Sequence, residues 1–199
     1  MRLCGDSFRS GCNLPGIGRV LKDVNDALVA EKPLRELALT GDERAFEDLI
    51  GPLVEPALRL AYAMLGDRGE AEDATQEAVT RAWRKLSQLR PGMPLRPWFL
   101  AIVGNQCRNM RRTQWFRLVR VPVVFRREAH AEPDVDRLDV ERALARLPDR
   151  DRQALFLRFY LDLTVEEVGL ALGLTPAAAK ARIYRACHRL RPDLLAEDA

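Results

Sequence analysis

The 199-residue sequence has only two histidines and four cysteines, which leaves little material for a metal site or for disulfide bonds. No two cysteines have the C-x-x-C spacing of zinc ligands, so we expect no bound metal and no other cofactor. Free thiols in a reducing cytoplasm are the default for this pattern, with a pair between the two N-terminal cysteines as the alternative. The four cysteines are Cys4, Cys12, Cys107 and Cys187.

Long apolar runs and a strong net charge are also missing. No stretch reaches the roughly 18 apolar residues of a membrane-spanning helix, and the N-terminus has no continuous apolar stretch typical of a signal peptide. We therefore expect a cytoplasmic protein. The 32 basic and 29 acidic residues give a net charge of only +3, so any nucleic-acid footprint must be local.

The strongest local pattern lies near the C-terminus. Thr164 and Glu167 have the spacing of a capping box, which predicts the start of a helix. Gly173 then ends that helix, and Thr175 followed by Pro176 begins another. Two short helices joined by a tight turn predict a helix-turn-helix.

The second of these helices has an apolar stripe and a polar face. The stripe consists of Ala179, Ile183, Ala186 and Leu190. On the opposite side, small residues allow close approach to a DNA groove, and basic residues reach phosphates or guanine edges. The alternative is a solvated surface helix. The polar side comprises Ala177, Lys180, Ala181, Tyr184 and Arg185, with Arg182 on its flank.

A separate helical domain is expected over residues 34–112. Helices are predicted from Gly41 onward, over 57–65, over 70–89 and over 97–112, with Pro52 and Pro56 breaking or kinking the first. In the third, Glu70, Asp73 and Glu77 form an acidic strip. A carboxylate metal site is disfavoured because this domain has no histidine, so the strip is either a solvated face or a docking site for a basic partner.

The helix over 97–112 combines an aromatic side chain with amides and guanidiniums on one face. Such a surface suits unstacked bases and a phosphate backbone. The alternative is that the aromatic residue covers the core and the arginines are merely solvated. This face comprises Trp98, Asn105, Arg108, Asn109 and Arg112.

The sequence as a whole predicts an all-α fold of two small helical domains joined by a flexible linker. Residues 1–33 are expected to be an extension that is disordered or forms one helix. Residues 113–137, basic and then acidic, are the linker. Residues 138–199 form the helix-turn-helix domain, with the apolar run over 154–161 as its buried central helix.

These motifs together resemble the extracytoplasmic-function (ECF) group of sigma-70 family RNA polymerase sigma factors. The resemblance rests on GDERAFEDLI, AEDATQEAVTRAWRKL, PWFLAIVGNQCRNMRR and the segment LPDRDRQALFLRFYLDLTVEEVGLALGLTPAAAKARIYRACHRL, in this order. It covers about residues 34–112 and 138–192.

The resemblance implies a non-enzymatic transcription initiation subunit. Its first domain would bind the β′ clamp helices of core polymerase through Asp73, Gln76 and Glu77. That domain would also capture a flipped −10 base with the loop 89–97 and Asn105. The expected partners are core polymerase, including its β flap, promoter DNA and an anti-sigma factor. The implied −10 contacts are Trp98, Asn105, Arg108, Asn109 and Arg112, and the implied −35 contacts are Thr175, Lys180, Ala181, Arg182, Tyr184 and Arg185.

Some features depart from the family pattern, and other functions stay open. Ala181 occupies a position that is often polar, so the −35 preference does not transfer. A stand-alone helix-turn-helix regulator would explain residues 138–192 but would not need the aromatic face or the acidic strip. A nuclease would need clustered acids or histidines facing DNA, which the pattern lacks, and a pure adaptor would lack the basic recognition helix.

Overall fold

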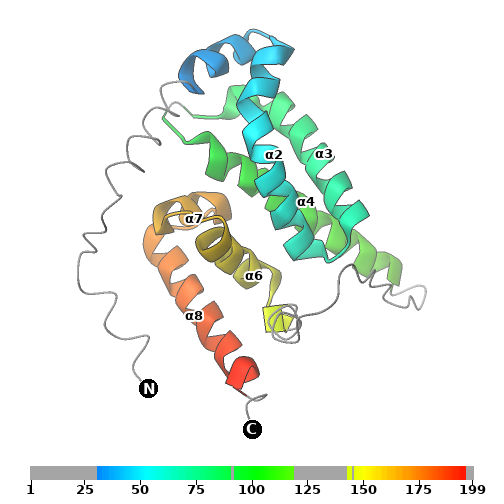
Figure 1. Cartoon of the computed structure of the whole chain (residues 1–199), viewed down its shortest axis with the longest axis vertical. Helices are drawn as coiled ribbons and strands as arrows, with labels where there is room; N and C mark the ends of the chain where they lie inside the picture. Colours follow the sequence, from blue (N-terminus) through cyan, green and yellow to red (C-terminus); the bar gives the residue numbers. More distant parts are fainter. Residues whose placement is uncertain (1–30, 91, 119–142, 145, 196–199) are drawn as a thin grey trace. The chain divides into compact units, whose positions relative to one another are not determined.

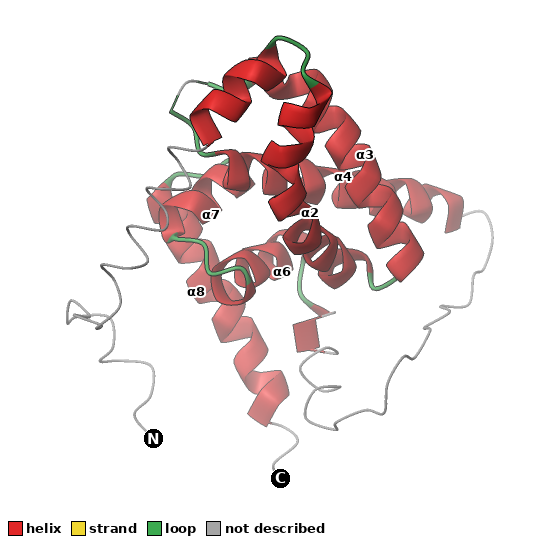
Figure 2. Ribbon diagram, turned by 45° about the horizontal axis from the view of Figure 1, so that its top comes forward, coloured by secondary structure: helices red, strands yellow, loops and turns green. Residues whose placement is uncertain are grey.

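The computed structural model describes residues 31–90, 92–118, 143–144 and 146–195. Within these ranges all regular structure is helical and no strand occurs, which confirms the all-α prediction (Figure 2). Cys4, Cys12 and most of the expected linker lie outside the described residues. The contacts divide the chain into two compact units, residues 1–49 and 50–199.

In the first unit, residues 31–39 are helical, so regular structure begins before the expected boundary at Leu34. A turn follows, in which Gly41 takes a positive φ of 97°. The Asp42 carboxylate then accepts a hydrogen bond from the backbone N–H of Ala45, at 3.0 Å. This satisfies a donor that the first helical turn leaves unpaired, so α2 (Glu43–Leu65) begins at this point.

The expectation that Pro52 and Pro56 break the first helix is wrong, because both lie inside α2 without ending it. Each proline removes one N–H donor and frees the carbonyl four residues earlier. The two prolines are four residues apart, so they disturb a single face of the helix. That face meets solvent at Asp48, Pro52 and Glu55, where water can satisfy the freed carbonyls.

In the second unit, α3 (Arg68–Lys85) and α4 (Leu95–Leu118) pack side by side (Figure 1). Asp67 caps α3 by accepting from the N–H of Glu70 at 2.8 Å, and the 3-10 helix η1 (Leu86–Gln88) follows α3. Small side chains let the two helices approach closely. Apolar side chains recur at helical spacing over 70–89 and over 97–112, which predicts a buried face of five residues on each helix. All five are buried in the first segment and four of the five in the second. The buried set comprises Ala71, Ala74, Ala78, Ala82, Leu86, Phe99, Leu100, Val103 and Cys107.

The ends of α4 differ from the expected ones. It begins at Leu95 and continues to Leu118, six residues beyond the predicted end, so the start of the expected linker is helical. Met110 is half-buried rather than buried. Burial raises the pKa of the Cys107 thiol to about 12, which keeps this side chain protonated as an apolar core residue. No helix in the described ranges is long and apolar enough to span a membrane.

The C-terminal helices are α6 (Asp149–Leu155), the π-helical turn η2 (Phe156–Tyr160), α7 (Val165–Leu172) and α8 (Pro176–Leu195). The capping box is confirmed, because Thr164 and Glu167 exchange hydrogen bonds at 3.2 and 2.8 Å. Gly173 ends α7 with a left-handed φ of 68°. The helix-turn-helix is therefore present over the predicted residues.

The turn between α7 and α8 depends on a second glycine that the sequence did not single out. A Cβ at Gly169 would lie only 2.9 Å from the backbone carbonyl oxygen of Leu174. Backbone cannot move aside as a flexible side chain can, so only glycine permits α7 and the turn to approach this closely.

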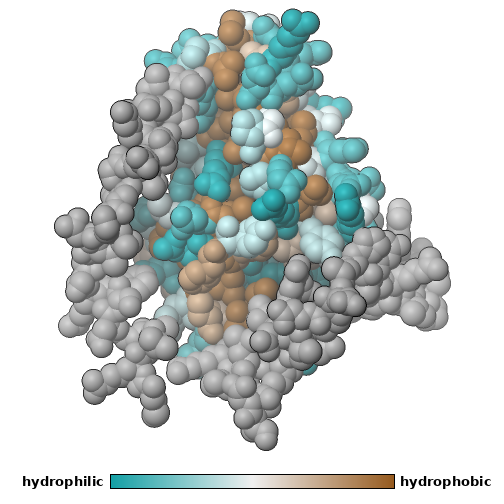
Figure 3. Space-filling view, in the orientation of Figure 1, coloured by the Kyte–Doolittle hydropathy of each residue, from teal (hydrophilic) through white to brown (hydrophobic). Residues whose placement is uncertain are grey.

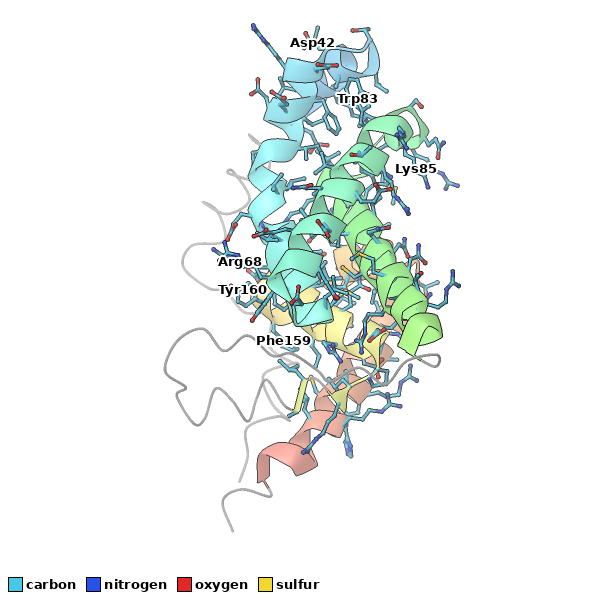
Figure 4. All side chains as sticks on the ribbon, turned by 90° about the vertical axis from the view of Figure 1, so that its right-hand side faces the viewer. Asp42, Arg68, Trp83, Lys85, Phe159 and Tyr160 are labelled. Atoms are coloured by element: carbon cyan, nitrogen blue, oxygen red, sulfur yellow. The ribbon has the colours of Figure 1, made fainter. Side chains whose placement is uncertain are left out.

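The prediction of a fully buried helix over 154–161 is wrong at its C-terminal end. Phe159 and Tyr160 are 66% and 55% exposed. The π-helical turn shifts the register of this segment, so these rings leave the core that Leu157 and Leu161 occupy. Figure 4 shows the two rings at the edge of the ribbon, and in Figure 3 apolar and hydrophilic residues are interspersed on the visible face.

Candidate nucleic-acid and partner interfaces

The outward face of α8 matches the predicted recognition surface. Ala179, Ile183 and Ala186 are buried, whereas Lys180, Ala181, Tyr184 and Arg185 are exposed. Thr175 is exposed as well, and its hydroxyl accepts from the N–H of Ala178 at 3.3 Å, so it also caps the helix. A capped helix that displays basic and aromatic side chains can enter a DNA groove as a rigid rod.

Arg182 lies apart from that face. Its Nη1 is 2.8 Å from the carboxylate of Asp151 on α6, which also pairs with Arg189. Asp151 is only 4% exposed, so this pair is largely removed from solvent. Arg182 therefore ties α8 to α6, and Asp151 positions α8. Sequence reasoning missed Asp151, because nothing local in the chain links it to a residue 31 positions away.

An ion pair within α3 partly neutralises the negative charge of the acidic strip. Asp73 and Gln76 are exposed, but Glu77 is half-buried and accepts from Arg81 at 2.7 Å. Such a surface pair contributes little to stability. In Figure 4, Arg68 and Lys85 mark the first and last turns of α3. The strip begins with Glu70 in the first turn and extends to the middle of the helix, whereas the last turn is basic.

The aromatic and amide face of α4 is exposed at most of its positions. Asn105, Asn109 and Arg112 are exposed, and Trp98 is half-buried at the N-terminal end. The Oδ1 of Asn105 accepts from Nη2 of Arg108 at 2.5 Å, so these two side chains act together.

Arg108 is the residue of this face that is least accessible to a ligand. Its Nη1 donates to Oε1 of Gln153 on α6. Burial, reinforced by the nearby charge of Arg150, lowers the pKa of Arg108 from its ordinary value. In this conformation the guanidinium is engaged by the protein rather than presented to a ligand.

The loop expected over 89–97 is shorter than predicted. Its last three residues are the first turn of α4, where Pro97 needs no N–H partner. Buried Leu89 and Leu95 anchor the two ends of the loop, and the N–H of Met93 donates to the carbonyl of Arg90 at 3.1 Å. No group of three histidine, cysteine or carboxylate side chains in the described part of the chain could hold a metal ion.

Family models match both halves of this arrangement. Residues 49–117 match sigma-70 region 2, and residues 137–190 match sigma-70 region 4. The first match contains α3 and all but the last residue of α4, and the second runs from before α6 to residue 190 of α8.

Relatives extend the similarity over most of the chain. The ECF RNA polymerase sigma factor ShbA of Streptomyces griseus is 31% identical over 172 residues, which cover 77% of this chain and 90% of ShbA. The ECF RNA polymerase sigma factor SigE of Mycolicibacterium smegmatis is also 31% identical, over 79% of this chain and 65% of SigE. The probable sigma factor RfaY of Xanthomonas campestris is 27% identical, and the match spans only 42% of its length.

Solved structures share the fold. The sigma factor RpoE of Bartonella quintana, crystallised with the anti-sigma factor NepR, has a TM-score of 0.65 at 23% identity, covering 77% of this chain and 98% of RpoE. CnrH, solved with the cytosolic domain of CnrY, has a TM-score of 0.64 at 24% identity, covering 85% of this chain and 99% of CnrH.

Proposed function

Because the chain belongs to the ECF group of sigma-70 family sigma factors, we propose that it binds RNA polymerase core and directs it to specific promoters. The observation that carries this proposal is the presence, in one chain, of two different DNA-facing surfaces. The exposed face of α8 suits duplex DNA, and the amide and aromatic face of α4 suits single-stranded DNA. A sigma factor needs both, because it reads a −35 duplex and helps to melt the −10 element. The role is binding, so we assign no catalytic residue.

We assign the partner surfaces by charge and exposure. The acidic strip on α3 would meet the β′ clamp helices, the C-terminal helices would meet the β flap, and these contacts would place the protein in the cytoplasm. RpoE of Bartonella quintana was solved with an anti-sigma factor, so such a factor is a further proposed partner. The domain assignment follows the same logic: 34–112 for region 2, 113–137 for the linker and 138–199 for region 4, with 1–33 as an extension.

Run-off transcription with purified core polymerase on genomic promoter fragments tests the proposal. We expect discrete transcripts that require both the chain and core. A stand-alone helix-turn-helix regulator would instead retain specific duplex binding without core and would produce no transcripts with core alone. That result would reject the sigma-factor assignment.

The first prediction concerns core docking. Reversing Asp73 and Glu77 to Lys should weaken core binding by about tenfold or more, because each reversal replaces an attraction to a basic surface by a repulsion. The fold should survive, since Asp73 is exposed and Glu77 contributes only a surface pair. Affinity for core, measured by fluorescence anisotropy of labelled chain, checks this.

A charge-matched control separates docking from net charge. Glu55 and Glu166 are exposed acids outside α3, and their reversal to Lys changes the total charge by the same amount. We expect this control to bind core nearly as tightly as the natural chain. Equal losses in both double variants would show that the strip on α3 is an ordinary solvated surface.

The second prediction distinguishes a base contact from a phosphate contact on α8. Arg185→Ala should cost about 1–3 kcal/mol on a −35 duplex and should relax specificity at one base pair, because Arg185 is exposed on the groove face. Lys180→Ala should weaken all sequences alike and lower the salt slope by about one, as loss of a phosphate contact does. Binding titrations on a set of singly mismatched duplexes check both. Uniform loss for Arg185→Ala across that set would reject base reading by Arg185.

A further inference from the structure

One exposed side chain of α8, His188, lies on the proposed −35 face but is not among the contacts proposed for it. The apolar stripe of α8, at residues 179, 183, 186 and 190, faces the core. Ala177, Ala181, Tyr184 and His188 repeat the spacing of that stripe two residues earlier, and all four are exposed. Two residues turn an α-helix by about 200°, so these side chains form one line opposite the core.

The place of His188 along α8 favours a phosphate contact over a base contact. It follows Tyr184 by four residues, which is about 6 Å further along the helix. In a DNA-recognition helix the N-terminal residues contact base edges, whereas the C-terminal end can contact the DNA backbone. A protonated imidazole is a cation with two N–H donors, so it suits a phosphate at the point where α8 leaves the groove.

The arginines next to His188 on α8 are of two kinds. Arg185, three residues earlier, is exposed on the adjoining side of the helix. Arg189, the next residue, is held by Asp151 of α6 together with Arg182. Among the side chains that the structure describes in α8 beyond Arg185, His188 is thus the one placed to add positive charge on the exposed line.

The charged groups on the helices that pack against α8 are engaged or lie elsewhere. On α6, Asp151 is bound by the two arginines of α8. The other charged side chains of α6 lie near α4 or bind backbone carbonyls, and they are Asp149, Arg150 and Arg152. On α7, Glu167 accepts from the N–H of Thr164, and Glu166 is exposed in the first turn. The response of this imidazole to pH therefore depends mainly on DNA.

We propose that His188 is a further DNA contact of α8, in which the imidazole binds a phosphate of the −35 duplex and binds it more tightly when protonated. The inference rests on the proposed function for the identity of the ligand as promoter DNA. Histidine is the side chain whose charge ordinarily changes between pH 5 and 8. A phosphate attracts the charged ring more strongly than the neutral one, so duplex affinity rises as the pH falls through this range. Promoter binding by the chain would then respond to acidity.

Fluorescence anisotropy of a fluorescein-labelled, mixed-sequence duplex, titrated with the full chain, tests the proposal. A mixed sequence suffices because a phosphate contact carries no sequence information. The titrations are made at about pH 5.5 and about pH 7.5, on either side of the ordinary pKa of a histidine. We expect about threefold to fivefold tighter binding at the lower pH, as for one exposed ion pair. The salt dependence of binding should also be steeper by about one at the lower pH.

Two substitutions of His188 assign the response. His188→Gln should bind at both pH values with the affinity that the natural chain has at the higher pH. His188→Lys carries a permanent charge, so it should bind at both pH values with the affinity that the natural chain has at the lower pH. Because His188 is exposed, neither change should alter the circular dichroism melting curve.

Two matched controls accompany them. His130→Gln removes the only other histidine of the chain and should keep the natural pH response. Leu37→Lys adds a charge at an exposed position outside both proposed DNA faces, so it should change duplex affinity little.

Several results would overturn the proposal. A natural chain with the same duplex affinity and salt dependence at both pH values, or with no duplex binding at either, would show that His188 is an ordinary solvated residue. A pH response that persists in His188→Gln, or disappears in His130→Gln, would assign the response to another group. A His188→Lys chain that binds no more tightly than Leu37→Lys would remove the phosphate contact. Failure of the proposed function would appear separately, as absence of run-off transcripts with core, and would leave these duplex titrations unaffected.

Discussion

Asp151→Asn is expected to destabilise the C-terminal helices by about 3 kcal/mol, because it breaks a largely buried ion pair. The carboxylate of Asp151 bridges Arg182 and Arg189 of α8, and it is only 4% exposed. Removing its charge leaves a largely buried guanidinium without its anion. Nε of Arg182 is already buried without a hydrogen-bond partner, so little is available to compensate.

Urea denaturation followed by circular dichroism measures this loss. The matched control is Asp162→Asn, because Asp162 also faces an arginine but its side chain is 96% exposed and the pair is 3.5 Å apart. An exposed pair contributes at most about 1 kcal/mol, so the control should stay close to the natural chain. If both variants lose the same stability, Asp151 is not the link between α6 and α8.

The same substitution should weaken −35 binding even when the chain remains folded. Arg182 and Arg189 lie on either side of Tyr184 and Arg185 in the sequence of α8, so loss of their common anchor loosens the exposed face between them. We expect reduced affinity for all duplex sequences and an unchanged ranking among them. A changed ranking would mean that Arg182 reads a base itself rather than positioning the helix.

Local signals explain why the helix-turn-helix could be predicted so closely. The capping box of Thr164 and Glu167 spans four residues, and the αL conformation of Gly173 follows from its missing Cβ. The apolar stripe of α8 is likewise a short-range periodicity. Such features depend on neighbours in the chain, so the sequence carries them in full.

The predictions that the structure corrects depend on residues far apart in the chain, or on local propensities that other effects outweigh. Pro52 and Pro56 violate helix propensity, yet α2 continues because their freed carbonyls can face solvent. The register of 154–161 shifts through a π turn that no spacing rule announces. Gln153 on Gly104 joins positions 49 residues apart, and the glycine alone gave no reason to expect a helix-to-helix contact there. The contact with Gln153 engages Arg108, whereas Asn105, Asn109 and Arg112 remain exposed on the α4 face.

Promoter opening should fail more severely than promoter binding when the α4 face is altered. A base inside a duplex is out of reach, so the holoenzyme must capture it flipped out, at an unstacking cost of a few kcal/mol. Half-buried Trp98 lies in the first turn of α4, just after the loop, and exposed Asn105 lies seven residues further along the same face of the helix. A base of the opened strand could stack on Trp98, and another could hydrogen-bond to Asn105. Stacking is worth about 1–3 kcal/mol per base, so loss of either side chain should slow opening by about tenfold or more.

Asn105→Ala is the cleaner of the two variants, because Asn105 is exposed and its side chain accepts a hydrogen bond from the neighbouring Arg108, whereas Trp98→Ala also removes a half-buried ring. Permanganate reactivity of unpaired thymines, followed with holoenzyme on a natural promoter and on a pre-melted copy, measures opening directly. We expect the defect to shrink substantially on the pre-melted template, since unstacking no longer has to be offset there. An equal defect on both templates would place these residues in binding or folding instead. A normal rate on both would remove the α4 face from the opening mechanism.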